Sequence, residues 1–358
     1  VQMSLVAIGE SNGNVARRCC EFLRSSIRVD GCWPIDTNLA TWVTTWSIHA
    51  LRWQDKSLCY ENRSALRDWL LGQQYRKVHP YTNAAPGGWA WTDLPGGVPD
   101  ADDTPGALVA LLELGVVDGT VRKAGLAGVK WLMDLQNSDG GIPTFCRGWG
   151  TLPFDRSSPD LTAHTLRAWN GWITLCDKGM RHKCNVAMGK GLEYLKRTQR
   201  ADGGWVPLWF GNEQIEGEEN VTYGTSRVLL ALRELRNAGR DIDATMKERA
   251  EKCLVSLQLE SGGWAGGLKQ VGKSELIPSV EETSLAVEAL AGTQYGAAAD
   301  RGAAWLVEQV ESGTWTKPAP IGFYFAKLWY FEALYPVALT VSALGAALRF
   351  SEQEQAPK

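Results

Sequence analysis

The sequence lacks several features that would assign it to a common class. Its eight cysteines form no CxxC pair and no run with metal-ligand spacing, so we expect buried, reduced thiols in a reducing compartment. The net charge of −3, from 37 Lys and Arg against 40 Asp and Glu, gives no electrostatic footprint for nucleic acid. No run approaches the ~18 apolar residues of a membrane-spanning helix, and no signal peptide is recognisable. These absences predict a cytoplasmic protein, with peripheral membrane contact and homo-oligomerisation left open.

Tryptophan, by contrast, is in excess: 17 Trp stand against 8 Phe and 9 Tyr. A side chain this bulky is hard to bury without a hydrogen-bond partner, so the count points to a repeated or functional role. Glycine followed by Trp recurs along the chain, at intervals of 51 to 63 residues between the aromatic positions. The six places are Gly31-Cys32-Trp33, Gly88-Trp89, Gly140-Gly141-Ile142, Gly204-Trp205, Gly263-Trp264 and Gly313-Thr314-Trp315.

Each repeat reads as a helical hairpin. A first helix carries apolar residues at helical spacing, as with Val129, Leu132 and Met133, and a Gly turn ends it. A Trp-bearing loop then leads to a second helix that is apolar nearly all round, which predicts an inner ring. We therefore predict an all-α fold, an (α/α)6 barrel of six hairpins complete within this chain. The predicted domains are an N-terminal extension (1–13), a single barrel (14–350) and a C-terminal tail (351–358).

A glutamine precedes the Gly turn in most repeats. We expect these glutamines and the aromatic residues after them to staple neighbouring hairpins together, as scaffold and not as part of a site. They are Gln74, Gln136, Gln199, Gln258 and Gln309.

Three aspartates, Asp100, Asp102 and Asp103, stand within four residues where a loop meets an inner helix. One Asp here would be an ordinary helix cap, but three exceed what a cap needs. Like charges ~4 Å apart repel by about 4 kcal/mol at an effective dielectric near 20. At ~1.36 kcal/mol per pK unit, this repulsion keeps at least one proton on the cluster near neutral pH. The pattern predicts a general acid.

Asp160 and His164 begin the next inner helix and, four residues apart, share one face of it. A lone histidine is commonly a satisfied core residue. In this arrangement, however, His164 would lie at the same end of the barrel as the aspartates. A cationic imidazole there could hold one aspartate ionised and orient the proton on another.

These motifs closely resemble those of the squalene–hopene and oxidosqualene cyclases, and of class II terpene cyclases generally, from about residue 14 to 350. The family's DxDD motif is matched by Asp100-Ala101-Asp102-Asp103, its partner segment by Asp160 to His164, and its QW motifs by the repeats. The resemblance implies that Asp102 protonates a terminal alkene or epoxide. It implies that Asp100 and Asp103 are anionic neighbours and that His164 is their ion-pair partner.

The resemblance also implies a cavity whose aromatic rings stabilise carbocations. For each ring, ordinary core packing stays an alternative. With Asp160, the residues expected to bind substrate are Trp42, Trp91, Phe145, Trp209, Tyr223 and Tyr324.

The sequence departs from the family in two ways. The larger cyclases are nearly twice this length and contain two barrels. The C-terminal GFPxDF-type motif is replaced by Pro320-Ile-Gly-Phe323-Tyr324-Phe325. The expected reaction is cyclisation of a linear polyprene, either squalene-like or a shorter prenyl diphosphate, without a cofactor. Mg²⁺ would serve only a diphosphate, with Arg76, Lys77 and Lys327 as basic residues near the entrance.

Three other functions remain open from the residues. An α/α-barrel glycoside hydrolase needs two carboxyls on different segments, which this cluster fits poorly, and a deep apolar pocket would exclude it. A zinc-dependent prenyl-binding toroid needs an Asp, Cys and His site that we cannot assemble from the sequence. A non-catalytic binding toroid predicts a solvent-exposed acid cluster or a barrel filled by side chains.

Overall fold

The computed structural model describes residues 1–29, 31, 33, 38–53, 58–145, 148, 153–267, 276–323 and 328–355, which form two compact units, Val1–Leu39 and Ala40–Lys358. The first unit contains α1 (Gln2–Ala7) and α2 (Asn14–Ser26), which contact each other. Residues 14–39, which we expected inside the barrel domain, group with this unit. Helix α2 buries only Ala16, and Trp33 Nε1 donates to the Leu23 carbonyl within the same unit at 2.7 Å.

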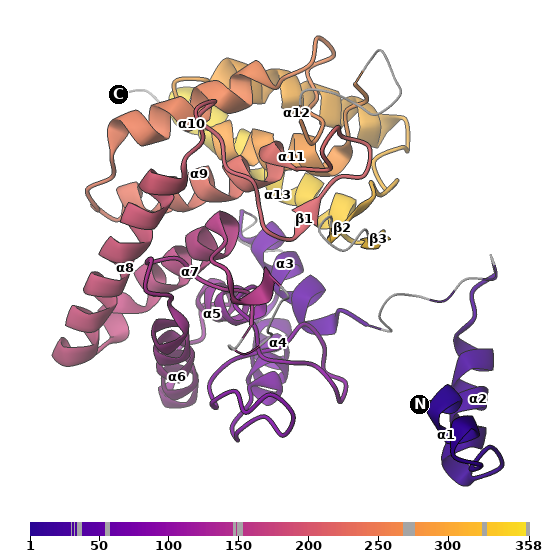
Figure 1. The fold of residues 1–358 in the computed structure, drawn as a ribbon. Helices are drawn as coiled ribbons and strands as arrows, with labels where there is room; N and C mark the ends of the chain where they lie inside the picture. The colour runs from indigo at the N-terminus through magenta and orange to yellow at the C-terminus, as the bar shows by residue number, and fades with distance from the viewer. Residues whose placement is uncertain are drawn as a thin grey trace. The chain divides into compact units, whose positions relative to one another are not determined.

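The second unit is a ring of inner helices in which each packs against the next and the last returns to the first. In ring order they are α3 (Ala40–Leu51), α5 (Asp103–Glu113), α7 (Pro159–Trp172), α9 (Val221–Asn237), α11 (Val280–Leu290) and α13 (Tyr335–Gln355). The outer helices between them are α4 (Tyr60–Gln73), α6 (Gly119–Leu135), α8 (Lys178–Thr198), α10 (Ala244–Ser256) and α12 (Gly296–Glu311). Figure 1 shows α6, α8, α10 and α12 at the periphery. The predicted all-α barrel is confirmed.

Burial explains why the second helix of each repeat lies inside. Every residue of α11 is buried, including its apolar residues and the glutamates Glu281, Glu282 and Glu288. The outer helix α10 buries only a stripe that includes Met246, Ala250, Cys253 and Leu254, at the spacing of one helical face. Each hairpin therefore places one helix in the wall of the barrel core and one over it.

The inner helices begin at the same end of the ring, where loops join neighbouring repeats. The backbone N–H of Thr41 donates to the Trp91 carbonyl oxygen (3.0 Å), and the backbone N–H of Ala101 donates to the Thr144 carbonyl oxygen (2.8 Å). A short antiparallel sheet lies at this end too, because its strands directly precede α9 and α13 (Figure 1). Its order is β1 (Phe210–Gly211), β2 (Ile321–Phe323), β3 (Leu328–Tyr330), with Phe210 paired to Phe323 and Gly322 to Trp329.

Four of the five predicted glutamine staples are confirmed. Gln199 Nε2, for example, donates to Gly203 O in its own turn (2.8 Å) and to Met246 O in the next outer helix (2.9 Å). The equivalent bonds are made by Gln74, Gln136 and Gln258. Gln309 differs, because its Oε1 accepts from the Thr314 hydroxyl at 2.7 Å instead. The repeat therefore joins successive hairpins through one amide.

Glycine is required in these turns by conformation and by space. Gly203 has a φ of +90°, and a Cβ there would lie 2.4 Å from the Arg249 carbonyl oxygen. Gly140 has the same φ, and its Cβ would lie 2.4 Å from Lys190 O. Only glycine combines the left-handed conformation with so close an approach to the next outer helix.

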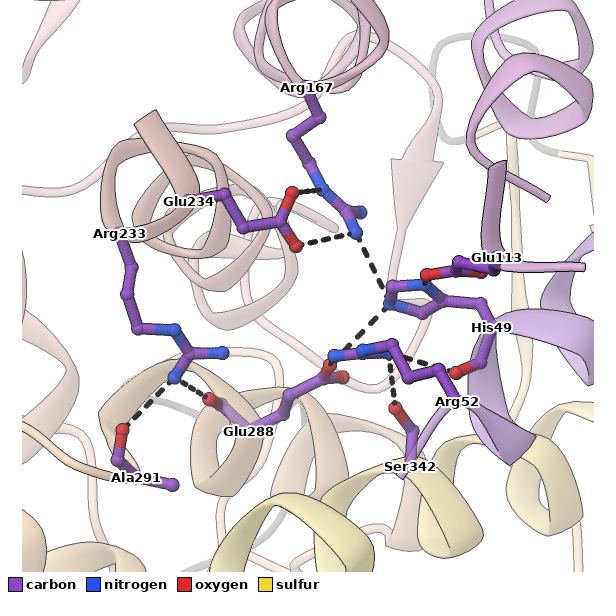
Figure 2. Close-up of polar contacts among 9 residues, drawn as sticks. All are labelled: His49, Arg52, Glu113, Arg167, Arg233, Glu234, Glu288, Ala291 and Ser342. Carbon is purple, nitrogen blue, oxygen red and sulfur yellow. Dashed lines mark hydrogen bonds and ion pairs between the residues drawn. The ribbon is translucent and has the colours of Figure 1, made fainter. Parts of the chain in front are cut away.

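Farther along the inner helices, away from their starts, polar side chains from all six form a network (Figure 2). Arg167 donates to both carboxylate oxygens of Glu234, each at 2.8 Å, and His49 Nδ1 lies 2.7 Å from Glu113 Oε1. Arg52 pairs with Glu288 and donates to Ser342 Oγ at 3.2 Å. The network links the ring across its interior, on the far side from the aspartate cluster.

Candidate active site

Asp100 shapes the start of α5. Its Oδ1 accepts the backbone N–H of Asp102 (2.8 Å) and of Asp103 (2.7 Å), and its backbone oxygen accepts from Thr104 (3.2 Å). Its backbone also pairs with that of Phe145 in an isolated bridge. Asp100 therefore fixes the turn that presents the other two aspartates.

The cluster holds protons at neutral pH, as its spacing predicts. Burial raises the pKa of Asp100 to about 7, although the N–H groups of Asp103 and Asp102 oppose the shift. Burial, then the charges of Asp100 and Asp102, raise the pKa of Asp103 well above its usual value. Asp100 and Asp103 also share a side-chain hydrogen bond, in which a protonated Asp103 would be the donor.

Asp102 is the most open of the three aspartates, with a side chain 17% exposed. Its Oδ1 lies 3.3 Å from His164 Nδ1. Burial and the nearby charge of Asp160 raise the pKa of Asp102 well above its usual value, while the positive charge of Arg227 acts in the opposite direction. The structure therefore places a protonated carboxyl beside an imidazole, with a guanidinium close enough to act on both.

His164 differs from its expected role as a cation. Burial lowers its pKa well below 6.5, and the positive charges of Arg227 and Arg167, then His49, lower it further. A neutral imidazole can accept the Asp102 proton in a hydrogen bond, and both pKa directions favour such a carboxyl–imidazole pair over an ion pair.

Arg227 supplies the positive charge that we had assigned to His164. It is buried on α9, and its Cζ lies 4.9 Å from the centroid of the Trp46 ring. Arg227 was not predicted from the sequence, although a signal was present: it interrupts the apolar stretch TSRVLLAL on an inner helix. A charge at such a position has to act on something inside the barrel.

Asp160 lies buried on α7, one turn before His164. It accepts a hydrogen bond from the Ser158 hydroxyl, whose oxygen in turn accepts from Leu208 N at 2.9 Å. Burial raises the pKa of Asp160, and its charge when ionised raises that of Asp102. These contacts position Asp160 to tune the acid, and its assignment to substrate binding stays a prediction.

Two of the predicted aromatic residues, Trp42 and Tyr223, line an enclosed space that we call the aromatic cavity. Trp42 Nε1 donates to the Tyr335 hydroxyl at 2.6 Å, and the rings of Phe210 and Tyr223 lie 4.8 Å apart. The empty space among its lining side chains, including the part open to solvent, is about 310 Å³. Its lining residues are Trp42, Trp46, Phe210, Tyr223, Glu281, Glu282, Leu285, Tyr335 and Leu339.

Three other predicted rings, Trp91, Phe145 and Trp209, gather beside Asp100. The Phe145 ring lies 6.2 Å from Trp91 and 5.4 Å from Trp209, and Trp209 stacks on Phe154 at 4.9 Å. Tyr324, with Lys327, lies outside the described residues. The sequence thus named two aromatic groups but not Phe154, Phe210 or Tyr335, which complete them.

A second space, the His164 cavity, has an empty volume of about 270 Å³, including the part open to solvent. It is lined by Thr45, Trp46, His49, Gly106, Val109, His164, Arg167 and Arg227. Trp46 lines both cavities, so its ring stands between them. The His164 cavity therefore connects the imidazole beside the acid to the polar network of Figure 2, which includes His49 and Arg167.

Other sequence expectations can be placed as well. Among the described residues, no three His, Cys, Asp or Glu side chains are grouped to hold a metal ion. Arg76, expected near the entrance, donates to the Leu71 carbonyl at 3.1 Å, and Lys77 is exposed. Over the same described ranges, no helix is both long and apolar enough to cross a membrane.

The family defined by the squalene–hopene cyclase C-terminal domain matches residues 38–349, and the chain belongs to that family. A probable squalene–hopene cyclase from Sinorhizobium fredii is 28% identical over 322 residues, covering 81% of this chain and 46% of that protein. The squalene–hopene cyclase of Alicyclobacillus acidocaldarius is 27% identical over 345 residues, covering 88% and 51%. The chain thus spans about half the length of these relatives.

Among solved structures, a variant of the type II terpene cyclase MstE from Scytonema, in complex with geranylgeranyl dihydroxybenzoate, has a similar fold. The TM-score is 0.63 at 18% identity, covering 93% of this chain and 96% of that one. The glycoside hydrolase and prenyl-binding alternatives are not favoured by the family match.

Proposed function

We propose that this chain cyclises a linear isoprenoid in a carbocation cascade that Asp102 starts by protonating the terminal alkene or epoxide. One observation carries the proposal. The pKa of the Asp102 carboxyl is raised well above its usual value, and this carboxyl lies 3.3 Å from His164 Nδ1 and feels the charge of Arg227. An acid that must still be protonated at neutral pH needs such a raised pKa.

The residues around Asp102 have separate roles in proton transfer. His164 orients the carboxyl through Nδ1. When Asp102 gives up its proton, the new carboxylate is stabilised by the positive charge of Arg227, which favours the ionised form. Asp103 and Asp100 stay partly protonated and so add little repulsion against the new charge.

The aromatic rings stabilise the cations that form after the first proton transfer. After protonation, each double bond attacks the preceding cationic carbon, and the electron pair of its π bond becomes the new C–C bond. The π faces of Trp42 and Tyr223 can stabilise the cations electrostatically, and the enclosed cavity keeps water from trapping them. Trp91, Phe145 and Trp209 are the corresponding rings beside Asp100.

The substrate class follows from this chemistry. We infer a linear isoprenoid, as in the names of the relatives, which mention squalene and geranylgeranyl dihydroxybenzoate. A hydrocarbon would require no cofactor, whereas a diphosphate would call for Mg²⁺ and basic residues. Because polyprenes partition into bilayers, we also propose peripheral membrane contact.

The test is to incubate the chain with squalene and with farnesyl, geranylgeranyl and longer diphosphates, and to identify products by mass spectrometry. Asp102→Asn should lower turnover of the accepted substrate at least 100-fold, as expected for loss of an essential acid. Asp134→Asn, at an exposed ion pair on α6, is the matched control. A folded Asp102→Asn protein that cyclises at the wild-type rate would contradict the proposal.

A further inference from the structure

Helix α11 begins with two consecutive glutamates, Glu281 and Glu282, that line the aromatic cavity. Acidic residues are common in a first helical turn, where they meet free N–H groups. Here that role is already filled, because the Ser279 hydroxyl caps the helix by accepting from Glu282 N at 3.1 Å. The two side chains are only 6% and 4% exposed, so their charge is withdrawn from solvent. Two buried carboxyls on an apolar helix need another explanation.

Each carboxyl is held by one oxygen only. Glu282 Oε1 accepts from Asn212 Nδ2 (3.0 Å) and Asn220 Nδ2 (2.9 Å), and Glu281 Oε1 accepts from Ala319 N (2.7 Å). The Oε2 atom of each glutamate is buried and has no hydrogen-bond partner among the described residues. Each of these two residues in the cavity wall thus has one carboxyl oxygen that no described residue engages.

The two glutamates differ in charge. Burial, then the neighbouring Glu282, raise the pKa of Glu281 to about 8, so it is mainly protonated at neutral pH. Burial raises the pKa of Glu282 as well, but the amides of Asn212 and Asn220 oppose this shift by donating to the ionised form. The two asparagine amides thus favour the ionised form at Glu282 and have no counterpart at Glu281.

The pair faces the acid from the opposite wall of the barrel. Following the ring from α5 in either direction, α11 is the third helix reached, and both helices start at the same end. Of the helices between them, α3 and α13 contribute Trp42 and Tyr335 to the cavity, and α9 contributes Tyr223. The cavity that the glutamates line is therefore built from helices on both sides of the ring between α5, where Asp102 stands, and α11.

We propose that Glu282 is the base that ends the cascade, an inference that rests on the proposed cyclase function. Its Oε2 takes a proton from the carbon next to the final cation. The electron pair of that C–H bond becomes the C=C bond of the product, and Glu282 becomes neutral until it returns the proton to solvent. One proton enters from Asp102 and one leaves to Glu282, so the reaction is an isomerisation. Neutral Glu281 places no second negative charge in the cavity.

If Glu282 is the base, replacing it should change which products form more than it lowers the rate at which substrate is consumed. With the accepted substrate, Glu282→Gln should consume it at a rate within about tenfold of wild type, because the acid is untouched. The wild-type alkene should fall at least tenfold as a share of the products, replaced by water-trapped alcohols or by alkene isomers. Glu282→Asp keeps a carboxylate and should restore part of the original alkene. Glu248→Gln, at an exposed pair with Lys252 on α10, is the control.

Two results would overturn the base assignment alone: an unchanged product profile in Glu282→Gln, or folded Glu282→Gln and Glu282→Asp proteins that no longer consume substrate. Circular dichroism establishes whether each variant folds. If Glu282→Gln does not fold, the product profile of Glu282→Asp decides. An unchanged rate and product profile in Glu282→Asp would argue against a base whose position matters. A wild-type chain that cyclises no polyprene would instead refute the cyclase function itself.

Discussion

Arg227 of α9 reaches across the barrel to Trp46 of α3, with its Cζ 4.9 Å from the ring centroid. The two helices are three places apart in the ring, so this cation–π contact spans the interior. Arg227 has no hydrogen-bond or ion-pair partner among the described residues, although it is only 7% exposed. A buried charge kept without a partner costs stability, which suggests that its field serves the acid.

Replacing Arg227 by Met should therefore change activity and stability in opposite directions. Without the positive charge, the pKa of Asp102 rises further and its carboxylate is less stabilised, so kcat should fall about tenfold and the basic limb of the pH–rate profile should move to higher pH. The melting temperature should hold or rise, because a buried unpaired charge is removed. Arg236→Met, at an exposed site on the same helix, is the control; parallel losses of kcat and Tm would argue for a structural role.

His164→Gln should lower kcat at least tenfold, since Asp102 loses the imidazole that orients it at 3.3 Å. The matched control is His182→Gln on the exposed face of α8. Steady-state kinetics with the accepted polyprene provide the measurement. An unchanged kcat would mean that Asp102 is oriented by other groups.

The contribution of two buried carboxyls to the stability of the protein should fall as the pH rises from about 4 to about 8. Asp100 and Glu281 have pKa values raised to about 7 and about 8 in the folded chain, against ~3.9 and ~4.3 when unfolded. Their contribution is fully present below the unfolded values and is lost as the pH rises through the folded ones. The double variant Asp100→Asn, Glu281→Gln should lose less melting temperature over this range than wild type does. Equal losses would contradict the raised pKa values.

The glutamine staples can be tested within one chain. Gln199→Ala removes two hydrogen bonds and leaves two backbone oxygens without their donor. The free energy of unfolding should therefore fall by about 2–3 kcal/mol. Gln309 makes no bond to a neighbouring hairpin among the described residues, so Gln309→Ala should lower the free energy of unfolding by less than about 1 kcal/mol. Urea denaturation measures both, and similar losses would show that the bridging bonds add nothing.

The sequence was sufficient to predict the barrel because burial alone sets the two patterns. Inner helices such as α11 are buried all round and outer helices such as α10 along one stripe, and both patterns are visible in the residues. The Asp100–Asp103 cluster was predictable because its members are local in sequence. The start of the compact unit at Ala40 was harder to predict from the sequence, because α2 has the helical pattern of an outer helix yet buries only Ala16.

Charge states were harder to predict, because they depend on neighbours far apart in the chain. His164 is neutral through burial and through Arg227, Arg167 and His49, from three different helices. Glu282 was not predicted as a site residue, because its partners Asn212 and Asn220 reach it only in the fold. No local spacing encodes such encounters.

The bonds that close the ring have a consequence for folding. Each glutamine staple joins residues 40 to 51 positions apart, so hairpins can associate in order as the chain emerges. The hydrogen bond between Trp42 and Tyr335 joins residues 293 positions apart and can form only after the others. Because distant contacts form slowly, the seam between α3 and α13 should be the last to close during folding. The aromatic cavity, which Trp42 and Tyr335 both line, would then be completed in the final step of folding.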